Sequence, residues 1–397
     1  MKLTKKFYLW GVTLALLLPL FGCGLFLDAV KTGVPDSAPL QNVQSGTDVV
    51  LIGNADWSGG SRSLSAITHY ASGTLDVNLV YDHNANPFEP GMGVNDIEVL
   101  ENTAYIVNST AGSLQVLNLL DGTSKEFALP AGSNPFDCVV VSHDEVYISL
   151  YLTNQVIKLN PSVAENANPL LATLAMPDGS ELAPYDASNP GNARPYGMKA
   201  VNGKLYVALN NLDNYYSIAG PGFVAVVDLS SFTVSQKVQG SGENMGNVAY
   251  FANFNSDYVF FISIGNYYPG DAGVIDIYSI SAQQVIASWN VGGMPGAMVM
   301  DAQNKAYIKD DQSAALKRID SPALTFSGFD MTYSISSGFL GGVLVDETGY
   351  LYIASSNTPG FGPDNKVYVY DTVSGTFIKT LTVGYNPAPM ALWKAPL

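Results

Sequence analysis

The chain has 397 residues and carries 34 acidic side chains against 18 lysines and arginines, so its formal net charge at pH 7 is −16. An acidic surface repels phosphate backbones and anionic headgroups, which argues against nucleic-acid binding and against membrane attachment through a basic patch. Only two cysteines occur, Cys23 and Cys138, so a fold held together by a disulfide framework is excluded.

The first 22 residues have the composition of a targeting segment. Lys2, Lys5 and Lys6 form a positive start, and residues 7–20 form an apolar stretch that is too short for a standard membrane span. Loss of this segment would remove three lysines and no acids, and would therefore move the net charge from −16 to −19.

The end of this segment resembles the bacterial lipobox, in which a cysteine that follows a small residue is lipidated and becomes the mature N-terminus. The residues are Leu20-Phe21-Gly22-Cys23. The resemblance implies a lipid anchor on Cys23, and a conventional secretory signal with an incidental cysteine is the alternative. Because glycine rather than aspartate follows Cys23, the bacterial sorting rule implies the outer membrane, on its periplasmic or its outer side, in a cell with two membranes.

Residues 23–47 are rich in Gly, Pro, Ser, Asn and Gln and have no sustained apolar periodicity, so we expect the lipidated cysteine to begin a flexible tether. From residue 48 to residue 397, short β-rich runs alternate with clusters of turn-forming residues. This alternation indicates one all-β domain.

A short apolar sequence motif typical of a β-strand, usually with an aromatic residue next to an aliphatic one, occurs seven times in this domain. The central residues of the seven copies are Leu51, Tyr105, Tyr147, Tyr206, Phe261, Tyr307 and Tyr352. Successive copies are about 42 to 59 residues apart, which fits one four-stranded blade per copy. The sequence therefore predicts a seven-bladed β-propeller.

Turn-forming residues mark the edges of each unit. Polar residues followed by glycine predict tight hairpins at residues 69–73, 118–122 and 371–375. Proline marks the predicted entry to the first strand of a blade, because it cannot donate to a ladder. These entries are Asn134-Pro135-Phe136, Arg194-Pro195-Tyr196, Met294-Pro295-Gly296 and Asn386-Pro387-Ala388. Together with the repeated strand, they resemble YVTN and NHL-type propeller repeats, which implies the same fold for residues 48–397.

The two ends of the chain are predicted to share a blade. Residues 390–393 match the innermost strand of the other units, but the chain stops there. The strands that this unit lacks are found at the other end of the domain, near residues 49–52, 64–68 and 77–81. We therefore expect one blade to be closed by N-terminal and C-terminal strands.

The loops between second and third strands are long and rich in aromatic residues, whereas the turns on the opposite face are predicted to be short. The long loops should surround one mouth of the central channel. Aromatic side chains there can supply large contact area at low entropic cost. The candidate partner-binding residues are Trp57, Tyr215, Tyr216, Tyr267, Tyr268 and Phe361. This pattern favours a non-catalytic module that binds a protein or glycan of the cell envelope.

A metal-dependent enzyme is the alternative. Alignment of the first strands places Asp96, Asp137 and Asn247 toward the channel, and such oxygen ligands suit calcium or magnesium. The set resembles that of gluconolactonase and regucalcin-like propellers, although no glutamate occupies the matching place. This resemblance implies a lactonase-like hydrolase in which the metal polarises a carbonyl or activates water.

His83 is the one histidine predicted near the channel mouth, where it could act as a general acid or base. In this respect the chain is similar to streptogramin-lyase-type propellers, which use histidine with magnesium. No Gly-rich phosphate loop, zinc-ligand spacing or Ser/His/Asp set is found, so the sequence favours binding over catalysis. Cys138 lies in an apolar strand run and is expected to be a buried small hydrophobe.

Overall fold

The structure is a computed structural model, and all the residues that it describes belong to the compact unit Asp36–Leu397. They are residues 40, 43, 45–55, 62–69, 73–82, 93–178, 181–182, 191–266, 272–335, 339–356, 365–384 and 386–396. Cys23, Trp57, His83, Tyr267, Tyr268 and Phe361 therefore lie outside the described residues.

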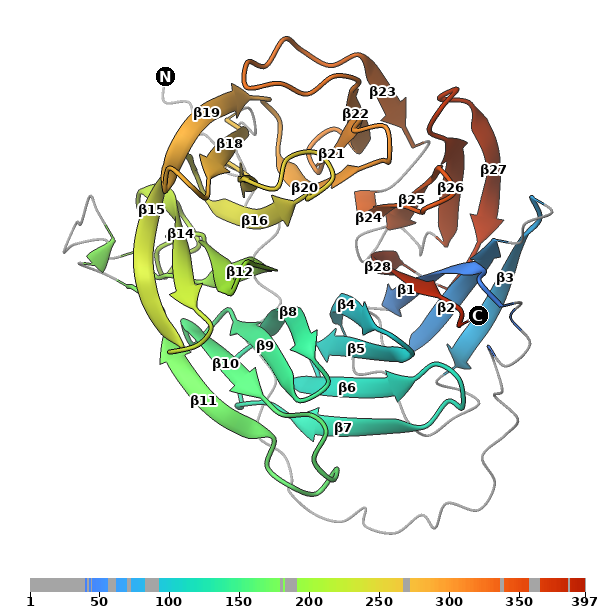
Figure 1. Cartoon of the computed structure of the whole chain (residues 1–397), viewed down its shortest axis with the longest axis horizontal. Coiled ribbons are helices and arrows are strands. Elements are labelled where there is room, and N and C mark those ends of the chain that lie inside the picture. The colour runs from blue at the N-terminus through green and yellow to red at the C-terminus, as the bar shows by residue number, and fades with distance from the viewer. Residues whose placement is uncertain are drawn as a thin grey trace, which may run out of the picture. The chain divides into compact units, whose positions relative to one another are not determined.

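Seven four-stranded antiparallel sheets form a ring around a central channel, which confirms the predicted all-β, seven-bladed propeller (Figure 1). Blade 1 contains β4 (Val94–Leu100), β5 (Thr103–Asn108), β6 (Ser113–Asn118) and β7 (Ser124–Ala128). Blade 2 contains β8 (Pro135–Ser142), β9 (Glu145–Leu150), β10 (Gln155–Leu159) and β11 (Leu170–Ala175). Blade 3 contains β12 (Pro195–Val201), β13 (Lys204–Leu209), β14 (Pro221–Asp228) and β15 (Thr233–Glu243).

Blade 4 contains β16 (Met245–Tyr250), β17 (Tyr258–Ser263), β18 (Val274–Ser279) and β19 (Gln284–Asn290). Blade 5 contains β20 (Pro295–Met300), β21 (Ala306–Asp310), β22 (Ala315–Ile319) and β23 (Met331–Ser334). Blade 6 contains β24 (Phe339–Val345), β25 (Tyr350–Ser356), β26 (Lys366–Asp371) and β27 (Phe377–Thr382). Blade 7 contains β28 (Pro387–Lys394), β1 (Asp48–Ala55), β2 (Arg62–His69) and β3 (Leu75–Asp82).

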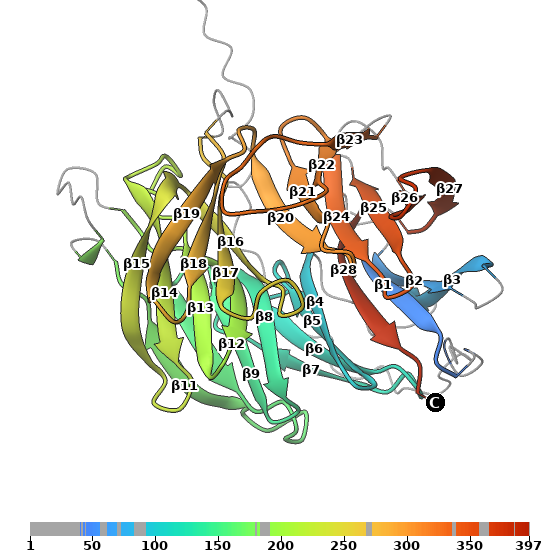
Figure 2. The same ribbon diagram turned by 45° about the horizontal axis from the view of Figure 1, so that its top comes forward.

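Blade 7 is built from both ends of the chain, as the sequence predicted. The C-terminal strand β28 pairs with β1, with Val49 opposite Trp393, and lies innermost in its sheet. Figure 2 shows β28 beside β1 at the end of the chain. Closure therefore comes from a strand pair and its packing, without a disulfide.

The repeated strand residue, aromatic in six blades and Leu51 in blade 7, is buried in the core of each blade. Six copies and Leu51 are at most 2% exposed. Two of the tyrosines also hold the turn between the first and second strands, since the Tyr307 hydroxyl donates to Asp301 Oδ2 (3.0 Å) and the Tyr352 hydroxyl donates to Asp346 Oδ2 (2.9 Å). Tyrosine recurs here because its ring fills the core while its hydroxyl reaches the turn.

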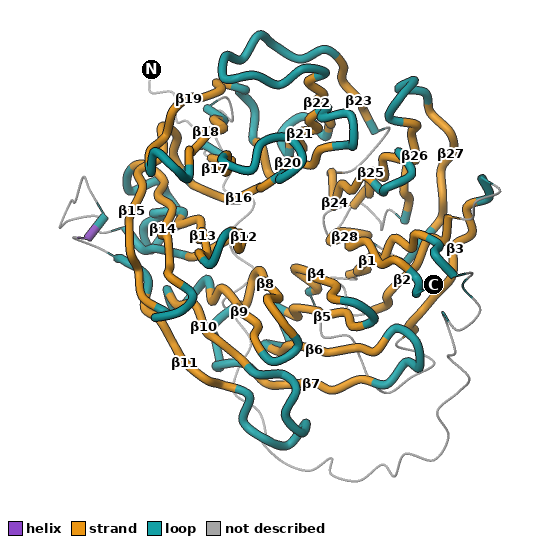
Figure 3. The backbone as a smooth tube through the Cα atoms, in the orientation of Figure 1, coloured by secondary structure: helices purple, strands orange, loops and turns teal. Residues whose placement is uncertain are grey.

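The core lies between neighbouring blades as well as within them. Between blades 3 and 4, for example, Tyr206 and Val226 belong to the same buried cluster as Val248 and Phe261. Cys138 is also buried, as predicted. Strands dominate the regular structure of the ring (Figure 3). Within the described part of the chain, no helix is long and apolar enough to cross a membrane.

In five of the blades, the described residue directly before the first strand lies in the left-handed backbone region. The positive φ angles are +48° at Asn134, +48° at Arg194, +55° at Asn244 and +47° at Asn386, and glycine takes this place at Gly93. Asn and Gly adopt this conformation readily, whereas Arg does so at a cost. Where the predicted entry prolines occur, they are the first residues of β8, β12, β20 and β28.

Candidate functional site

A register shift lies near the start of each first strand in blades 1 to 6, and it re-aims the side chains that face the channel. Asp96, in blade 1, turns toward blade 2. Its Oδ2 accepts hydrogen bonds from Cys138 N (3.0 Å) and from Cys138 Sγ (3.3 Å). Asp137, in blade 2, accepts a hydrogen bond from Met198 N of blade 3. Both carboxyl groups therefore join one blade to the next.

Asn247 makes the same kind of link from blade 4. Its Nδ2 donates to Gly296 O of blade 5 (3.2 Å), and its Oδ1 accepts from Val248 N (2.8 Å). On the other side it is packed against Gly197 of blade 3, where an added Cβ would come within 2.4 Å of Asn247 Oδ1. The side chain thus fills the space between three consecutive blades.

The three predicted metal ligands are engaged with backbone, and their bonds run to three different blades. Desolvation raises the pKa of Asp137 well above its ordinary value, with a further rise from the charge of Asp96 and a hydrogen bond to it. Among the described residues, no group of three or more His, Cys, Asp or Glu side chains is arranged to hold a metal ion. We therefore assign Asp96, Asp137 and Asn247 a structural role, and metal binding stays a prediction.

One ion pair crosses the channel wall beside these acids. Lys199 Nζ of blade 3 lies 3.7 Å from Glu98 Oε1 of blade 1. Desolvation raises the pKa of Glu98, and the nearby Lys199 charge opposes that rise. The charge of Glu98 in turn raises the pKa of Lys199. This pair and the Asp96–Asp137 pair concentrate ionisable groups on the blade 1 to 3 side of the channel.

A cluster of aromatic rings around one arginine connects blades 2 and 3, and we call it the aromatic–arginine cluster. Its members are Phe136, Tyr151, Arg194, Tyr196 and Tyr216. The Phe136 and Tyr196 ring centroids are 3.5 Å apart, and the Tyr151 and Tyr216 rings stack at 6.5 Å. The guanidinium carbon of Arg194 lies 4.3 Å from the Tyr216 ring centroid and 5.3 Å from that of Tyr151. These distances place the cation beside the stacked ring pair and within cation–π range of both rings.

Arg194 is fixed by polar contacts as well as by the rings. It is only 6% exposed, its Nη2 donates to Asp213 O (3.1 Å), and its backbone N donates to Asn154 Oδ1 (2.9 Å). Its Nε is buried and has no hydrogen-bond partner. No described carboxylate forms an ion pair with this guanidinium.

The loop that carries Tyr216 is shaped by one acid. Asp213 Oδ1 accepts from Tyr215 N (2.7 Å) and Ser217 N (2.8 Å). This bonding leaves Tyr215 87% exposed and Tyr216 50% exposed. Two large aromatic side chains are therefore presented to solvent by an ordered loop.

Sequence reasoning selected Tyr215 and Tyr216 but did not select the other members of the cluster. The structure brings Tyr216 into it and leaves Tyr215 beside it in solvent. Phe136 and Tyr196 could have been selected from the sequence, since each directly follows an entry proline. Arg194 could also have been noticed, because it precedes its entry proline where Asn134 and Asn386 precede theirs.

The prediction that all turns on the opposite face are short was wrong. The turns between first and second strands are short in blades 1 to 3, at residues 101–102, 143–144 and 202–203. In blades 4 to 6 they lengthen to residues 251–257, 301–305 and 346–349. These longer turns bring additional aromatic and acidic side chains to that face.

Comparison with known proteins supports the fold. No protein-family model matches the chain, and no curated protein matches it. Among solved structures, a protein from Lactobacillus plantarum is similar, with a TM-score of 0.61, 14% identity and coverage of 87% of this chain and 99% of that one. Virginiamycin B lyase from Staphylococcus aureus is similar at a TM-score of 0.53 and 12% identity, over 76% of this chain and 91% of that one.

Hydrazine synthase from Kuenenia stuttgartiensis is also similar, with a TM-score of 0.51 and 13% identity, over 75% of this chain and 88% of that one. Fold and comparisons together define the chain as a seven-bladed β-propeller. Identities this low show the fold alone, and the different names of the similar proteins agree with the rule that propellers are a scaffold for unrelated functions.

Proposed function

We propose that this protein is a lipid-anchored binding module of the cell envelope that captures a protein or glycan through its aromatic–arginine cluster. The single observation that carries the proposal is the contact of Arg194 with the Tyr151 and Tyr216 rings, with Tyr196 packed on Tyr151 and with the exposed Tyr215 alongside. Rigid aromatic side chains near an arginine are the residue types that dominate binding hot spots. The rings also offer flat apolar faces for a sugar ring or a peptide side chain.

The backbone at Arg194 supports a functional role. Other entries use Asn or Gly in the left-handed conformation, and Arg194 adopts it with a φ of +48°. Such a residue costs on the order of 1–3 kcal/mol, and strain of this kind gathers at ligand-binding positions. Selection for folding alone would favour asparagine at this entry, as at Asn134 and Asn244.

Two substitutions test the role of the cluster. In the soluble chain with Cys23→Ser, Tyr216→Ala should reduce capture of a partner by about tenfold, because it removes one π face of the cluster. Arg194→Asn should abolish capture while the chain stays folded. Asparagine relieves the left-handed strain but loses the bond to Asp213 O and the two ring contacts, so a lower melting temperature is expected and folding is checked before capture is compared. Capture is measured with immobilised protein, using envelope extract and, in a separate arm, the purified envelope glycan.

The matched control is Phe377→Ala, which removes a 53% exposed aromatic ring from β27 on the periphery. It should bind as the parent does. Equal capture by the parent, Tyr216→Ala and Arg194→Asn would refute the proposal, as would absence of any captured partner. The two arms separate a protein partner from a glycan.

The lipid anchor has its own test, because it rests on Cys23 and its neighbours in the sequence. The full chain expressed in a bacterium with two membranes should sediment with the outer membrane, and its N-terminal peptide should carry the mass of acyl chains on Cys23. Cys23→Ser should lose the acyl mass. A parental N-terminal peptide without acyl mass, or the same acyl mass in Cys23→Ser, would contradict lipid anchoring.

A further inference from the structure

The face opposite the aromatic–arginine cluster carries a cavity of about 350 Å³. It is built by the three long turns that follow β16, β20 and β24 of consecutive blades. Its walls are formed by residues 250–254, 300–302, 304 and 345–347. Its volume is in the range of small-molecule sites. Nothing in the proposed capture of a partner uses this cavity.

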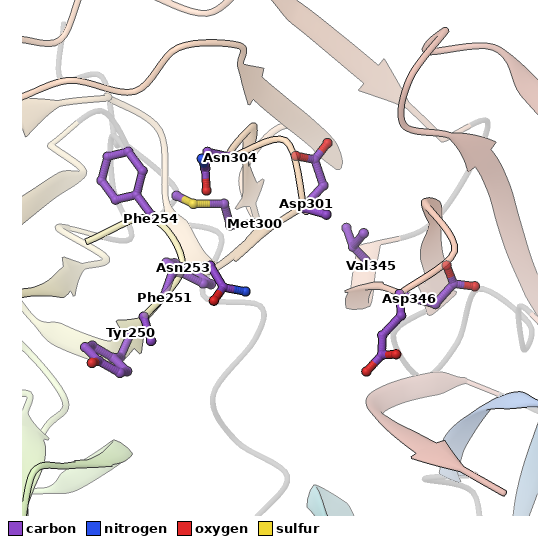
Figure 4. A pocket seen from close by; sticks show the side chains of 12 residues that line it. Tyr250, Phe251, Asn253, Phe254, Met300, Asp301, Asn304, Val345 and Asp346 are labelled. Atoms are coloured by element: carbon purple, nitrogen blue, oxygen red, sulfur yellow. The ribbon is translucent and has the colours of Figure 1, made fainter. Parts of the chain in front are cut away.

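One wall of the cavity is aromatic and held in place. Phe251 and Phe254 both pack on the buried Phe260, with ring centroids 5.8 and 6.1 Å away. Tyr250 is tethered by its hydroxyl, which donates to Ser256 O (3.3 Å). Figure 4 shows these side chains from blade 4 on one side of the cavity, with Met300 close by. The wall therefore presents preorganised apolar surface and π faces.

The other walls carry acidic side chains (Figure 4). Asp301 is buried, and its Oδ1 accepts from Gln303 N (3.0 Å) and Lys305 N (2.8 Å). Asp346 is buried in the same way, and its Oδ1 accepts from Thr348 N (3.0 Å) and Tyr350 N (2.8 Å). The second oxygens accept from core tyrosines, Asp301 Oδ2 from the Tyr307 hydroxyl (3.0 Å) and Asp346 Oδ2 from the Tyr352 hydroxyl (2.9 Å). Turns and core thus hold two buried carboxylates rigidly in the cavity walls, where they act through their charge.

These carboxylates have little compensating charge. In the described part of the chain no lysine or arginine pairs with Asp301 or Asp346, although His69 Nδ1 lies 3.4 Å from Asp346 Oδ2. Lys305 Nζ is directed to Thr372 O (2.7 Å), and Lys394 pairs with Glu347. The cavity therefore has an excess of negative charge.

The neighbouring Asp48 is affected by the same excess of negative charge. It is buried, and its Oδ2 has no hydrogen-bond partner. Desolvation raises its pKa most, and the negative charges of Asp346 and Glu347 raise it further. The pKa of Asp48 is raised in part by this negative charge, and a bound cation would neutralise the charge.

We propose that the cavity binds a small organic cation, with its charged group near Asp301 and Asp346 and its apolar part on the Phe251 and Phe254 wall. Aromatic faces and carboxylates together suit an ammonium group better than a metal ion, because only the organic cation gains from the π faces. All four carboxylate oxygens already accept hydrogen bonds from turn backbone or from core tyrosine hydroxyls, so they are poor candidates for a metal shell. A quaternary ammonium group needs no hydrogen bond from them and is attracted by their charge alone.

The test uses the soluble Cys23→Ser chain, titrated by calorimetry at low ionic strength with choline and with its uncharged isostere dimethylbutanol. Saturable choline binding is expected, with the isostere at least about tenfold weaker because it lacks the charge. Phe254→Leu should weaken choline binding about tenfold, because leucine keeps the packing on Phe260 and removes the π face. Phe377→Ala is the control and should bind as the parent does.

Folding of Phe254→Leu is checked by its melting temperature. The choline affinity of Phe251→Leu tests a second residue of the same wall. No saturable choline binding, equal binding of choline and dimethylbutanol, or parental affinity in both leucine variants would overturn the proposal. Tighter binding of calcium than of choline would also overturn it. All of these results are independent of partner capture at the opposite face.

Discussion

Removal of residues 390–397 is expected to prevent the chain from forming a stable, monomeric ring. The deletion takes away most of β28, the innermost strand of blade 7, and leaves β1 without its partner. It also removes Trp393, which is 1% exposed and whose Nε1 donates to Asn102 Oδ1 of blade 1 (3.2 Å). Truncating one buried tryptophan to alanine costs about 3–5 kcal/mol, and a whole domain has only about 5–15 kcal/mol of stability.

The measurement combines size-exclusion chromatography with thermal melting. The deleted chain should aggregate through its exposed strand edges. Removal of residues 396–397 alone is the matched control, because it keeps β28 and the hydrogen bond from Ala395 N to Thr47 O (3.0 Å). The control should melt like the full chain. A monomeric 390–397 deletion with unchanged melting would show that strand closure does not stabilise the ring.

Asp137→Asn is expected to stabilise the protein near neutral pH, whereas Asp137→Ala should destabilise it. Because the folded-state pKa of Asp137 is raised above its ordinary value, the folded chain holds a proton that the unfolded chain releases first. Stability is therefore lost as pH rises from about 4 through the folded pKa, and changes no further above it. Asparagine is neutral at every pH, can accept from Met198 N and can donate to Asp96, so it avoids this loss.

Alanine removes both contacts and leaves Met198 N without its acceptor, which should cost about 1–3 kcal/mol. Denaturant unfolding at a series of pH values from 4 to about 8 should show a smaller fall in stability for Asp137→Asn than for the parent. Some fall should remain, because the pKa of Glu98 is also raised and Glu98 faces the same channel beside Lys199.

The same variants test the metal-dependent alternative. Melting is repeated in EDTA and in graded calcium and magnesium. A parental pH slope in Asp137→Asn would contradict the raised pKa. A saturable, metal-dependent rise in the melting temperature that Asp137→Ala abolishes would contradict the purely structural role and restore the lactonase-like hypothesis.

Blade number, strand order and closure were predictable from local patterns. Tyr307 and Tyr352 fit this repeated position because the ring fills the blade core while the hydroxyl holds the turn. Pro135 and Pro195 mark blade entries because proline cannot continue a ladder. Trp393 lies in a strand whose partners could be identified by asking which unit was incomplete. Each of these features depends on a short stretch of sequence, so it can be predicted from a single sequence.

The candidate sites were only partly predictable. Alignment placed Asp96 and Asp137 correctly in the first strands but could not tell that the shifted register turns them toward the next blade's backbone. The aromatic loop was identified at Tyr216, whereas its contact with Arg194 depends on how two blades meet. The cavity joins turns that are about 45 to 95 residues apart in the chain.

The sequence by itself therefore determined the seven-bladed architecture and its closure, because periodicity and local turn chemistry carry that information. The lipid anchor at Cys23 stays a prediction. Only the tertiary structure decided which polar and aromatic side chains meet. Their directions depend on strand bulges, on the left-handed residues at five blade entries and on the angle between blades. Those quantities arise when the ring closes, and no local pattern encodes them.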